Sequence, residues 1–351
     1  MHEFSTREVS YILSLVFTII ALAGCGLFEE EEDCGDSSYK VFLSWSPDGE
    51  KIAFRSDGQL HVINADGTGR VDLTADWGLN WWSSFASHSW SPDGTKIAFD
   101  YPPRDHAGAR ADIHITNVDG TSQFNLTNNN VNRDVSPSWS PDGTKIAFES
   151  SHYGASSGPY DRPIGIDICV MNADGTSSAD QLSHGNSPSW SPDGTKIAYS
   201  AHDGSLWVMN ADGTDKRNLT ESLDALQCSH RAVSWSPDGT KIVFEALNLN
   251  GWQICVINTD GTSSADHLSY GCYPYWSPDG EKIVYSTHGL EIYVMNADGA
   301  GKRKLTKGYC PSWSPDGTKI AFLRCCGPPT SQQRPLWVMN ADGTNERRLA
   351  D

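Results

Sequence analysis

The sequence lacks both a hydrophobic run long enough for a mature membrane-spanning helix and an excess of basic residues. Its amino-terminal apolar run, Tyr11 to Leu22, falls short of the roughly 20 residues that cross a bilayer. Lys and Arg number 26 against 44 Asp and Glu, which gives a net charge of -18. Nucleic-acid binding needs a basic stripe, and none is visible, so we expect no nucleic-acid partner.

Metal-ligand spacings are also missing. The nine cysteines include no C-x-x-C pair, and the adjacent Cys325 and Cys326 do not supply that spacing. No two histidines repeat a ligand spacing, and the x-D-G turns lack the D-x-D-x-D-G pattern of a calcium loop. We therefore predict no metal and no cofactor.

What the sequence does have is one repeated phrase, spelled in full between Ser189 and Thr214. Its first half, W-S-P-D-G-x-K-I, occurs seven times, with the tryptophan at Trp45, Trp90, Trp139, Trp190, Trp235, Trp276 and Trp313. Its second half ends in x-D-G, with the glycine at Gly67, Gly120, Gly175, Gly213, Gly261, Gly299 and Gly343. The tryptophans lie 37 to 51 residues apart, and repeats of roughly 40 to 50 residues are typical of four-stranded propeller blades.

Each repeat predicts four short strands, A to D, joined by tight turns. In the turn from Ser191 to Gly194, proline sets φ at the second position and glycine takes the left-handed site of a type I turn with a bulge. Strand B places Ile97 and Phe99 on one face and Ala98 on the other, as expected for a blade held between two neighbours.

We predict an all-β fold: a seven-bladed β-propeller with four antiparallel strands per blade, over residues 39–351. The first strand A runs from Tyr39 to Trp45 and the last strand D from Arg347 to Leu349, so both terminal blades are whole. Fourteen aspartates are turn residues of the repeats, which accounts for much of the negative charge.

The phrases W-S-P-D-G-x-K-I-A-F and I-Y-V-M-N-A-D-G-T resemble the TolB-type, WD-like propeller repeat over residues 39–351. Similar repeats occur in gating domains of prolyl-oligopeptidase-like peptidases and in some polysaccharide lyases, so the resemblance implies a fold more firmly than a function. TolB carries an α/β domain before its propeller, whereas here only Gly26 to Ser38 lie between the expected signal segment and blade 1. We therefore expect a TolB-like protein other than TolB itself.

Residues 1–24 predict a signal peptide that ends in Leu22-Ala23-Gly24-Cys25, which resembles a bacterial lipobox. The resemblance implies cleavage before Cys25 and lipidation of its thiol; the alternative is an ordinary signal peptide with an incidental cysteine. Residues 25–38 include a run of acidic residues and predict an extended tether. We expect a monomer in the bacterial cell envelope, on the periplasmic side or the cell surface, with the lipid as its only membrane contact.

Alternating strand direction divides the propeller into two faces. The turn face carries the A–B and C–D turns, which are uniform, and the loop face carries the B–C and D–A connections. The loop face varies, with expanded segments at 75–87, 101–112, 150–167, 221–232, 246–253 and 324–335. Binding residues concentrate on variable loops of a rigid scaffold, so we expect a partner on the loop face.

Four aromatic residues crowd into the crossing between blades 1 and 2, which we predict as the centre of the binding site: Trp77, Trp81, Trp82 and Phe85. The alternative is that they cap the two blades as a small core. Aromatic and arginine side chains dominate interfaces, and those that complete the predicted rim are Tyr101, Arg104, Tyr153, Tyr160, Arg162, Trp252 and Arg334.

Seven cysteines map to the predicted loop face, and an exported chain meets an oxidising compartment. The D–A entry and the B–C loop of blade 7 emerge side by side, which predicts a disulfide between Cys310 and either Cys325 or Cys326. Cys169 and Cys255 are expected near the start of their strands C.

These observations predict a non-catalytic binding scaffold for an envelope protein, peptide or glycan. The alternative is a carbohydrate-active lyase or hydrolase on the same propeller, for which the candidates are loop-face histidines: His88, His152, His184, His202, His230 and His288. Gly154 to Gly158 match the G-x-S-x-G pattern, but that motif needs a strand before it and a helix after it, and Pro159 follows here.

Overall fold

The computed structural model describes residues 43–56, 58–75, 87–101, 110–129, 132–153, 163, 165–221, 227–248, 251–324 and 334–350. For residues 227–232 and 248 it describes the backbone alone. All of these belong to one compact unit, residues 37–351. The described residues contain no helix with the length and hydrophobicity needed to span a membrane.

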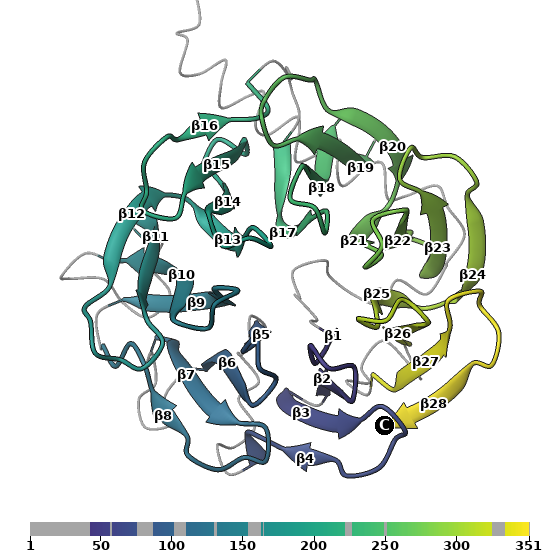
Figure 1. Cartoon of the computed structure of the whole chain (residues 1–351), viewed down its shortest axis with the longest axis horizontal. Coiled ribbons are helices and arrows are strands. Elements are labelled where there is room, and N and C mark those ends of the chain that lie inside the picture. Colours follow the sequence, from purple (N-terminus) through teal and green to yellow (C-terminus); the bar gives the residue numbers. More distant parts are fainter. Residues whose placement is uncertain are drawn as a thin grey trace, which may run out of the picture. The chain divides into compact units, whose positions relative to one another are not determined.

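The strands form seven sheets of four, arranged as blades around a ring (Figure 1). Blade 1 holds β1 (Leu43–Trp45), β2 (Lys51–Ser56), β3 (Gln59–Asn64) and β4 (Val71–Asp72). Blade 2 holds β5 (His88–Trp90), β6 (Lys96–Tyr101), β7 (Asp112–Asn117) and β8 (Phe124–Asn125). Blade 3 holds β9 (Arg133–Trp139), β10 (Lys145–His152), β11 (Gly165–Asn172) and β12 (Asp180–His184).

The remaining blades repeat this order. Blade 4 holds β13 (Asn186–Trp190), β14 (Lys196–Ser200), β15 (Leu206–Asn210) and β16 (Arg217–Asn218). Blade 5 holds β17 (Gln227–Trp235), β18 (Lys241–Asn248), β19 (Gly251–Asn258) and β20 (Asp266–Tyr270). Blade 6 holds β21 (Cys272–Trp276), β22 (Lys282–Ser286), β23 (Glu291–Asn296) and β24 (Arg303–Lys307). Blade 7 holds β25 (Tyr309–Trp313), β26 (Lys319–Leu323), β27 (Leu336–Asn340) and β28 (Arg347–Ala350).

The predicted all-β, seven-bladed propeller is confirmed, with antiparallel pairing in chain order inside every blade. The two terminal blades are whole: β1 pairs with β2, and blade 7 consists of β25 to β28. Blades 1 and 7 meet through packed side chains, in a core that includes Leu43, Phe54, Leu323 and Leu336. The ring therefore closes by blade-to-blade packing.

Strand B is buried on both faces, as its sequence predicts. Ile97, Ala98 and Phe99 are each exposed by 1% or less. Ala53 of blade 1 packs in the same cluster as Ile97 and Phe99 of blade 2, so small side chains of one blade face large ones of the next. This alternation lets each sheet stack closely on its neighbour.

Each repeat tryptophan packs in a core cluster shared with the preceding blade, and in four of the seven blades its indole N–H also donates to that blade. The indole Nε1 of Trp190 donates to the carbonyl of Ser138 at 3.1 Å, and that of Trp235 to the carbonyl of Ser189 at 3.2 Å. Trp45 makes the same bond at the closure, to the carbonyl of Ser312 at 3.1 Å. The repeat therefore specifies the contact between neighbouring blades as well as the fold of each blade.

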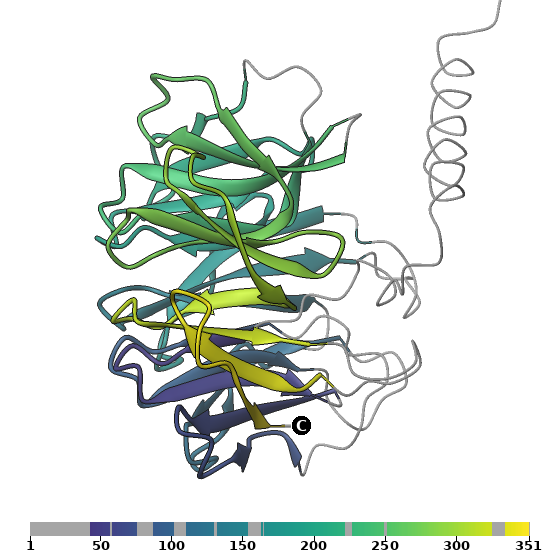
Figure 2. The same ribbon diagram turned by 90° about the vertical axis from the view of Figure 1, so that its right-hand side faces the viewer.

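The S-P-D-G turns form as the sequence predicts. In blade 4 the N–H of Gly194 donates to the carbonyl of Ser191 at 2.9 Å, and Gly194 adopts φ of +71°. The Asp193 carboxylate accepts hydrogen bonds from the Ser191 hydroxyl at 2.6 Å and from the Thr195 N–H at 3.0 Å. These turns lie together along one side of the ring, the turn face (Figure 2).

Strands extend into two segments that were expected to be loops on the loop face. In blade 3, β10 continues to His152 and β11 begins at Gly165, which takes up both ends of the segment 150–167. In blade 5, β18 continues to Asn248 and β19 begins at Gly251. The two strands pair without interruption, from Lys241 opposite Asn258 to Asn248 opposite Gly251. Both blades therefore carry a longer B–C hairpin toward the loop face than the sequence indicated.

Candidate functional site

The predicted aromatic centre of the binding site lies outside the described residues. This holds for Trp77, Trp81, Trp82 and Phe85, for the rim residues Arg104, Tyr160 and Arg162, and for Cys25, Cys325 and Cys326. Their roles remain predictions. Tyr101, Tyr153, Trp252 and Arg334 are described.

Tyr101 was expected on the binding rim, and the structure corrects this. It is the last residue of β6 and is only 1% exposed. Its ring belongs to the core between blades 1 and 2, with Leu60 and Phe99. Strand B of blade 2 continues past the repeat pattern, and the alternation of side chains turns Tyr101 to the same face as Phe99.

The three other described rim residues are partly exposed and come from three blades. Tyr153 follows β10, and the guanidinium of Arg110 lies 3.6 Å from the centre of its ring. Trp252 stands in β19 of blade 5, and Arg334 precedes β27 of blade 7. An arginine over an aromatic ring is a cation–π contact, which holds both side chains in place at the loop face.

Seven Asp, Glu and Arg side chains are buried among the described residues, and all of them lie in the loop-face half of their strands: Arg55, Asp100, Asp112, Asp134, Glu149, Asp167 and Glu245. Four directly follow the strand B aromatic: Arg55, Asp100, Glu149 and Glu245. Blades 4, 6 and 7 have Ser200, Ser286 and Leu323 there. This departure from the repeat was visible in the sequence, although the prediction did not use it.

Two buried carboxylates meet where blade 2 passes to blade 3. Asp112 accepts a hydrogen bond from Asn125 Nδ2 at 2.7 Å, and Asp134 accepts one from the Ser150 hydroxyl at 2.6 Å and one from Asn129 Nδ2 at 2.5 Å. Burial raises the pKa of both carboxyl groups, and the negative charge of Asp112 raises that of Asp134 further. Asparagine side chains thus hold an acidic pair in place at this end of the ring.

Asp167 of β11 lies two strands further out than Asp134 of β9 and contacts two histidines. Its Oδ1 is 2.5 Å from His184 Nδ1, and its Oδ2 is 2.7 Å from His152 Nε2. Asp134, Ser150, Asp167 and His184 face one another in register across β9, β10, β11 and β12. One row of polar side chains therefore crosses the whole of blade 3 at its loop-face end.

Two further polar contacts each join a strand A residue to the neighbouring blade, close to the centre of the ring. His88 Nε2 lies 2.7 Å from the Ser44 hydroxyl of the neighbouring blade. Burial, with the charge of Arg55, lowers the pKa of His88 to about 3, so the imidazole is neutral. In blade 5, the Glu245 carboxylate accepts the backbone N–H of Tyr273.

The cysteines differ from expectation in part. Cys169 and Cys255 are mid-strand residues of β11 and β19, buried between blades rather than on the loop face. Burial raises the pKa of both thiols to about 12, so they are unreactive at neutral pH. Cys310 is a buried free thiol in this structure, and its predicted disulfide stays a prediction because both candidate partners lie outside the described residues.

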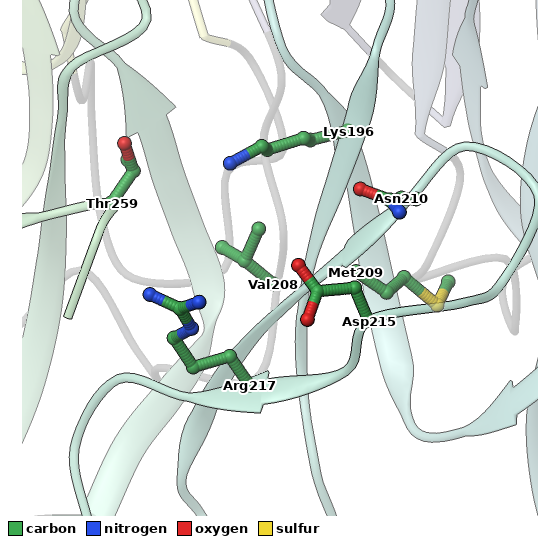
Figure 3. Close-up of a pocket in the computed structure, with 7 residues that line it drawn as sticks. All are labelled: Lys196, Val208, Met209, Asn210, Asp215, Arg217 and Thr259. Carbon is green, nitrogen blue, oxygen red and sulfur yellow. The ribbon is translucent and has the colours of Figure 1, made fainter.

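The turn face holds a small cavity between blades 4 and 5 (Figure 3). It has a volume of about 10 Å³ and is lined by residues that include Lys196, Asp215, Arg217 and Thr259. A space of that size admits roughly one water molecule. Arg217 Nη1 donates to the Asp260 carbonyl of blade 5, so the arginine joins two blades. The cavity is a blade joint rather than a ligand site.

Comparison with known proteins agrees with this architecture. Residues 167–351 match the family model described as the TolB beta propeller domain. No curated protein sequence matches the chain.

Solved structures of the same fold include two oligogalacturonate lyases and a TolB. An oligogalacturonate lyase from Vibrio parahaemolyticus is 15% identical with a TM-score of 0.64, over 86% of this chain and 89% of that one. An oligogalacturonate lyase in complex with manganese is also 15% identical, with a TM-score of 0.66. The match covers 86% of this chain and 89% of that one. TolB from Acinetobacter baumannii is 16% identical with a TM-score of 0.50, over 89% and 79%. At these identities the likeness shows the fold alone.

Proposed function

The chain belongs to the TolB β-propeller family, and we propose that it acts as a non-catalytic binding module that holds a protein, peptide or glycan partner on its loop face. In this proposal Cys25 carries a lipid, residues 25–38 form the tether, and the propeller works in the bacterial cell envelope, on the periplasmic side or the cell surface. The lipid is the only membrane contact.

One observation carries the proposal. The buried Asp, Glu and Arg side chains of the described residues all lie toward the loop face, whereas the turn face repeats the same hydrogen-bonded turn in each blade. Burying a charged group costs free energy unless it is paired, so a stable fold gains little by concentrating such groups at one end. Binding sites need them, because specificity comes from a few placed polar groups.

Blades 1 to 3 are the proposed centre of the site. The crossing with Trp81 and Trp82 ends at Ser87, whose backbone N–H is bound by the buried Asp100 carboxylate. Further round the ring, the Arg110–Tyr153 pair presents an ordered aromatic and cationic surface. Aromatic and arginine anchors of this kind supply most of the binding energy at interfaces.

Capture of partners from detergent-solubilised envelopes tests the proposal. We expect the double variant Trp81→Ala with Trp82→Ala, and separately Tyr153→Ala, to capture the partner at least about ten-fold less efficiently at an unchanged melting temperature. Tyr270→Ala is the matched control, because Tyr270 is a 53% exposed tyrosine of blade 5, away from the proposed centre. If the tryptophan variant melts early and loses binding only in proportion, those residues are core.

The anchor is tested independently. Intact mass spectrometry of the membrane-extracted protein should find a chain that begins at Cys25 with added acyl mass. An unmodified terminus at another residue would remove the lipid from the proposal and leave the binding surface unaffected.

A second candidate function is a carbohydrate-active lyase or hydrolase, favoured by one specific observation. His184 is oriented by Asp167 at 2.5 Å and is 76% exposed. A carboxylate that fixes the tautomer of an accessible histidine is the usual arrangement of a general base. Incubation with polygalacturonate should then yield unsaturated or reducing products that His184→Gln abolishes; no product from the wild-type protein excludes this candidate for that substrate.

A further inference from the structure

Strand A of four blades contains a residue other than glycine with a left-handed backbone, always directly before the proline of that strand. These residues lie three positions before the repeat tryptophan in blades 3, 4, 6 and 7: Ser136, Ser187, Tyr273 and Cys310. Their φ angles lie between +50° and +57°. This conformation is uncommon outside glycine and persists only where the surrounding structure compensates for its cost. A compensating contact is therefore expected at each of these positions.

Blade 6 shows one such contact. The N–H of Tyr273 donates to the Glu245 carboxylate, which reaches it from the preceding blade. Glu245 is 2% exposed, and a hydrogen bond to a charged group is stronger away from water. Glu245 directly follows the strand B aromatic. The blades that precede the two left-handed serines also have an acidic residue at that position: Asp100 and Glu149.

Blade 7 has the left-handed residue, but the preceding blade has no acidic residue at the corresponding position. Ser286 stands there instead. Val284, two residues earlier in β22, packs in the core shared by blades 6 and 7, so Ser286 also points toward blade 7. Ser286 is completely buried, and its Oγ has no hydrogen-bond partner among the described residues. By the repeat, the N–H of Cys310 faces this hydroxyl where that of Tyr273 faces a carboxylate.

Arg334 supplies positive charge beside the same position. Cys310 is 5% exposed, and Arg334, which precedes β27 of the same blade, is partly exposed. Burial raises the pKa of the Cys310 thiol; the positive charge of Arg334 lowers it and the negative charge of Glu245 raises it. The Arg334 guanidinium therefore lies within electrostatic reach of Cys310, while the Glu245 carboxylate is bound to Tyr273.

We propose that the Cys310 N–H, the Ser286 hydroxyl and Arg334 form a site for the carboxylate of an aspartate or glutamate side chain of a polypeptide partner. The proposal rests on the proposed function and names the chemistry of the partner. Its template lies within the repeat, because one blade earlier a glutamate side chain brings its carboxylate to the equivalent backbone N–H. A carboxylate gains both from charge-assisted hydrogen bonds and from an arginine. Since Ser286 is buried, the ligand enters from the loop face as the Arg334 side chain turns aside.

The variant Ser286→Glu tests the site without a partner. It supplies the carboxylate from within the chain, as Glu245 does, so we expect the melting temperature of the full mature chain to rise by about 2 °C or more. Ser200→Glu is the matched control. Ser200 is equally buried at the same position of blade 4, but Ala232, the counterpart of Cys310 in blade 5, does not have a left-handed backbone. The control should melt earlier, because its buried carboxylate gains no such donor. Equal destabilisation in both variants would overturn the proposal.

Binding is measured by nuclear magnetic resonance on the full mature chain in detergent, labelled with nitrogen-15 at cysteine. The probe is the tripeptide acetyl-alanyl-glutamyl-alanine amide. We expect a saturable shift of the Cys310 amide signal, which Cys310→Ser identifies, and no shift of Cys255, which is buried between blades 4 and 5. Arg334→Gln should weaken binding at least about ten-fold, and Ser286→Glu should abolish it.

The matched probe carries glutamine in place of glutamate and should bind at least about ten-fold more weakly. No shift at Cys310, or equal binding of the two peptides, would overturn the proposal. Tighter binding of glucuronate than of the glutamyl peptide would assign the site to an acidic glycan and overturn the polypeptide partner. Capture through Tyr153 and the Trp81–Trp82 crossing is measured separately, so either proposal fails without the other.

Discussion

At the scale of single residues, the glycine of each S-P-D-G turn is set by backbone geometry. Gly194 has φ of +71°, and a Cβ there would meet Pro141 of the preceding blade at 3.5 Å, an ordinary contact. The cost of a side chain is therefore conformational. We expect Gly194→Ala to lower the free energy of unfolding by about 1–2 kcal/mol in urea titration.

A second glycine provides the matched control for this substitution. Gly165 begins β11, has no positive φ, and a Cβ there would have open space. Gly165→Ala should leave the unfolding free energy unchanged or raise it slightly. Equal losses in the two variants would contradict the argument from backbone conformation.

The turn aspartates predict how stability depends on pH. The pKa of the aspartate is lowered in all seven S-P-D-G turns; for Asp193 the main causes are hydrogen bonds from the Ser191 hydroxyl and the Thr195 N–H. A carboxyl whose folded pKa is depressed stabilises the fold above its unfolded pKa of about 4 and loses that contribution as pH falls through the folded pKa.

We therefore expect the urea midpoint to fall as the pH is lowered from 5 toward 3. Asp112 and Asp134 have a raised pKa, so their contribution to the unfolding free energy increases as the pH falls. The seven turn aspartates outnumber these two residues. A midpoint that stays constant or rises on acidification would show that the turn hydrogen bonds do not stabilise the fold.

Prediction at the residue scale succeeded where the repeat is strict and failed where it is broken. The turn glycines and the buried Ile97 and Phe99 follow from pattern and stereochemistry. The His152–Asp167–His184 group does not, because these residues are distant in sequence and meet only through the register of three strands. Tyr101 was misplaced because one extra residue of strand B decides which way its side chain points.

At the scale of elements, an arginine at the start of strand D joins neighbouring blades. Arg347 of β28 donates to the Asp66 carbonyl at 3.0 Å and to the Ala65 carbonyl at 2.8 Å, both in the C–D turn of blade 1. Arg303 of β24 makes the same contact with the Asp342 carbonyl of blade 7 at 2.9 Å. The contact at Arg347 is the one that spans the closure of the ring.

Arg347→Ala should therefore loosen the closure. We expect the unfolding free energy to fall by about 1 kcal/mol, which is below the usual range for hydrogen bonds to a charged donor because the site is exposed. Arg348→Ala, at the next residue, removes an exposed arginine but leaves both hydrogen bonds of Arg347 to blade 1 in place, and serves as control. Hydrogen exchange should quicken at the C–D turn of blade 1 in the Arg347 variant alone; unchanged exchange there would argue against the joint.

The lengths of the B–C hairpins in blades 3 and 5 show what the sequence could not settle at this scale. Polar residues such as Glu149, Ser150 and Glu245 are typical of loops, yet they continue strands β10 and β18. Their side chains are buried in the folded protein, and that burial depends on tertiary packing rather than on local propensity.

At the scale of the whole molecule, the number of blades, their four-stranded order and the closure between whole terminal blades could all be predicted. The repeat fixes them, because each blade exposes two apolar faces that only a ring of blades can cover. The repeat says nothing about the partner, since the residues that would select it lie in segments that depart from the repeat.

Site-specific photo-crosslinking in intact cells tests the central claim, that the loop face is the binding surface. A photoreactive phenylalanine derivative, which keeps an aromatic ring, replaces Tyr153 on the loop face or, in a second strain, Asp193 on the turn face. We predict a discrete crosslinked partner from position 153 and none from position 193, at equal amounts of folded protein. Crosslinks from position 193 alone, or equally from both, would contradict the account.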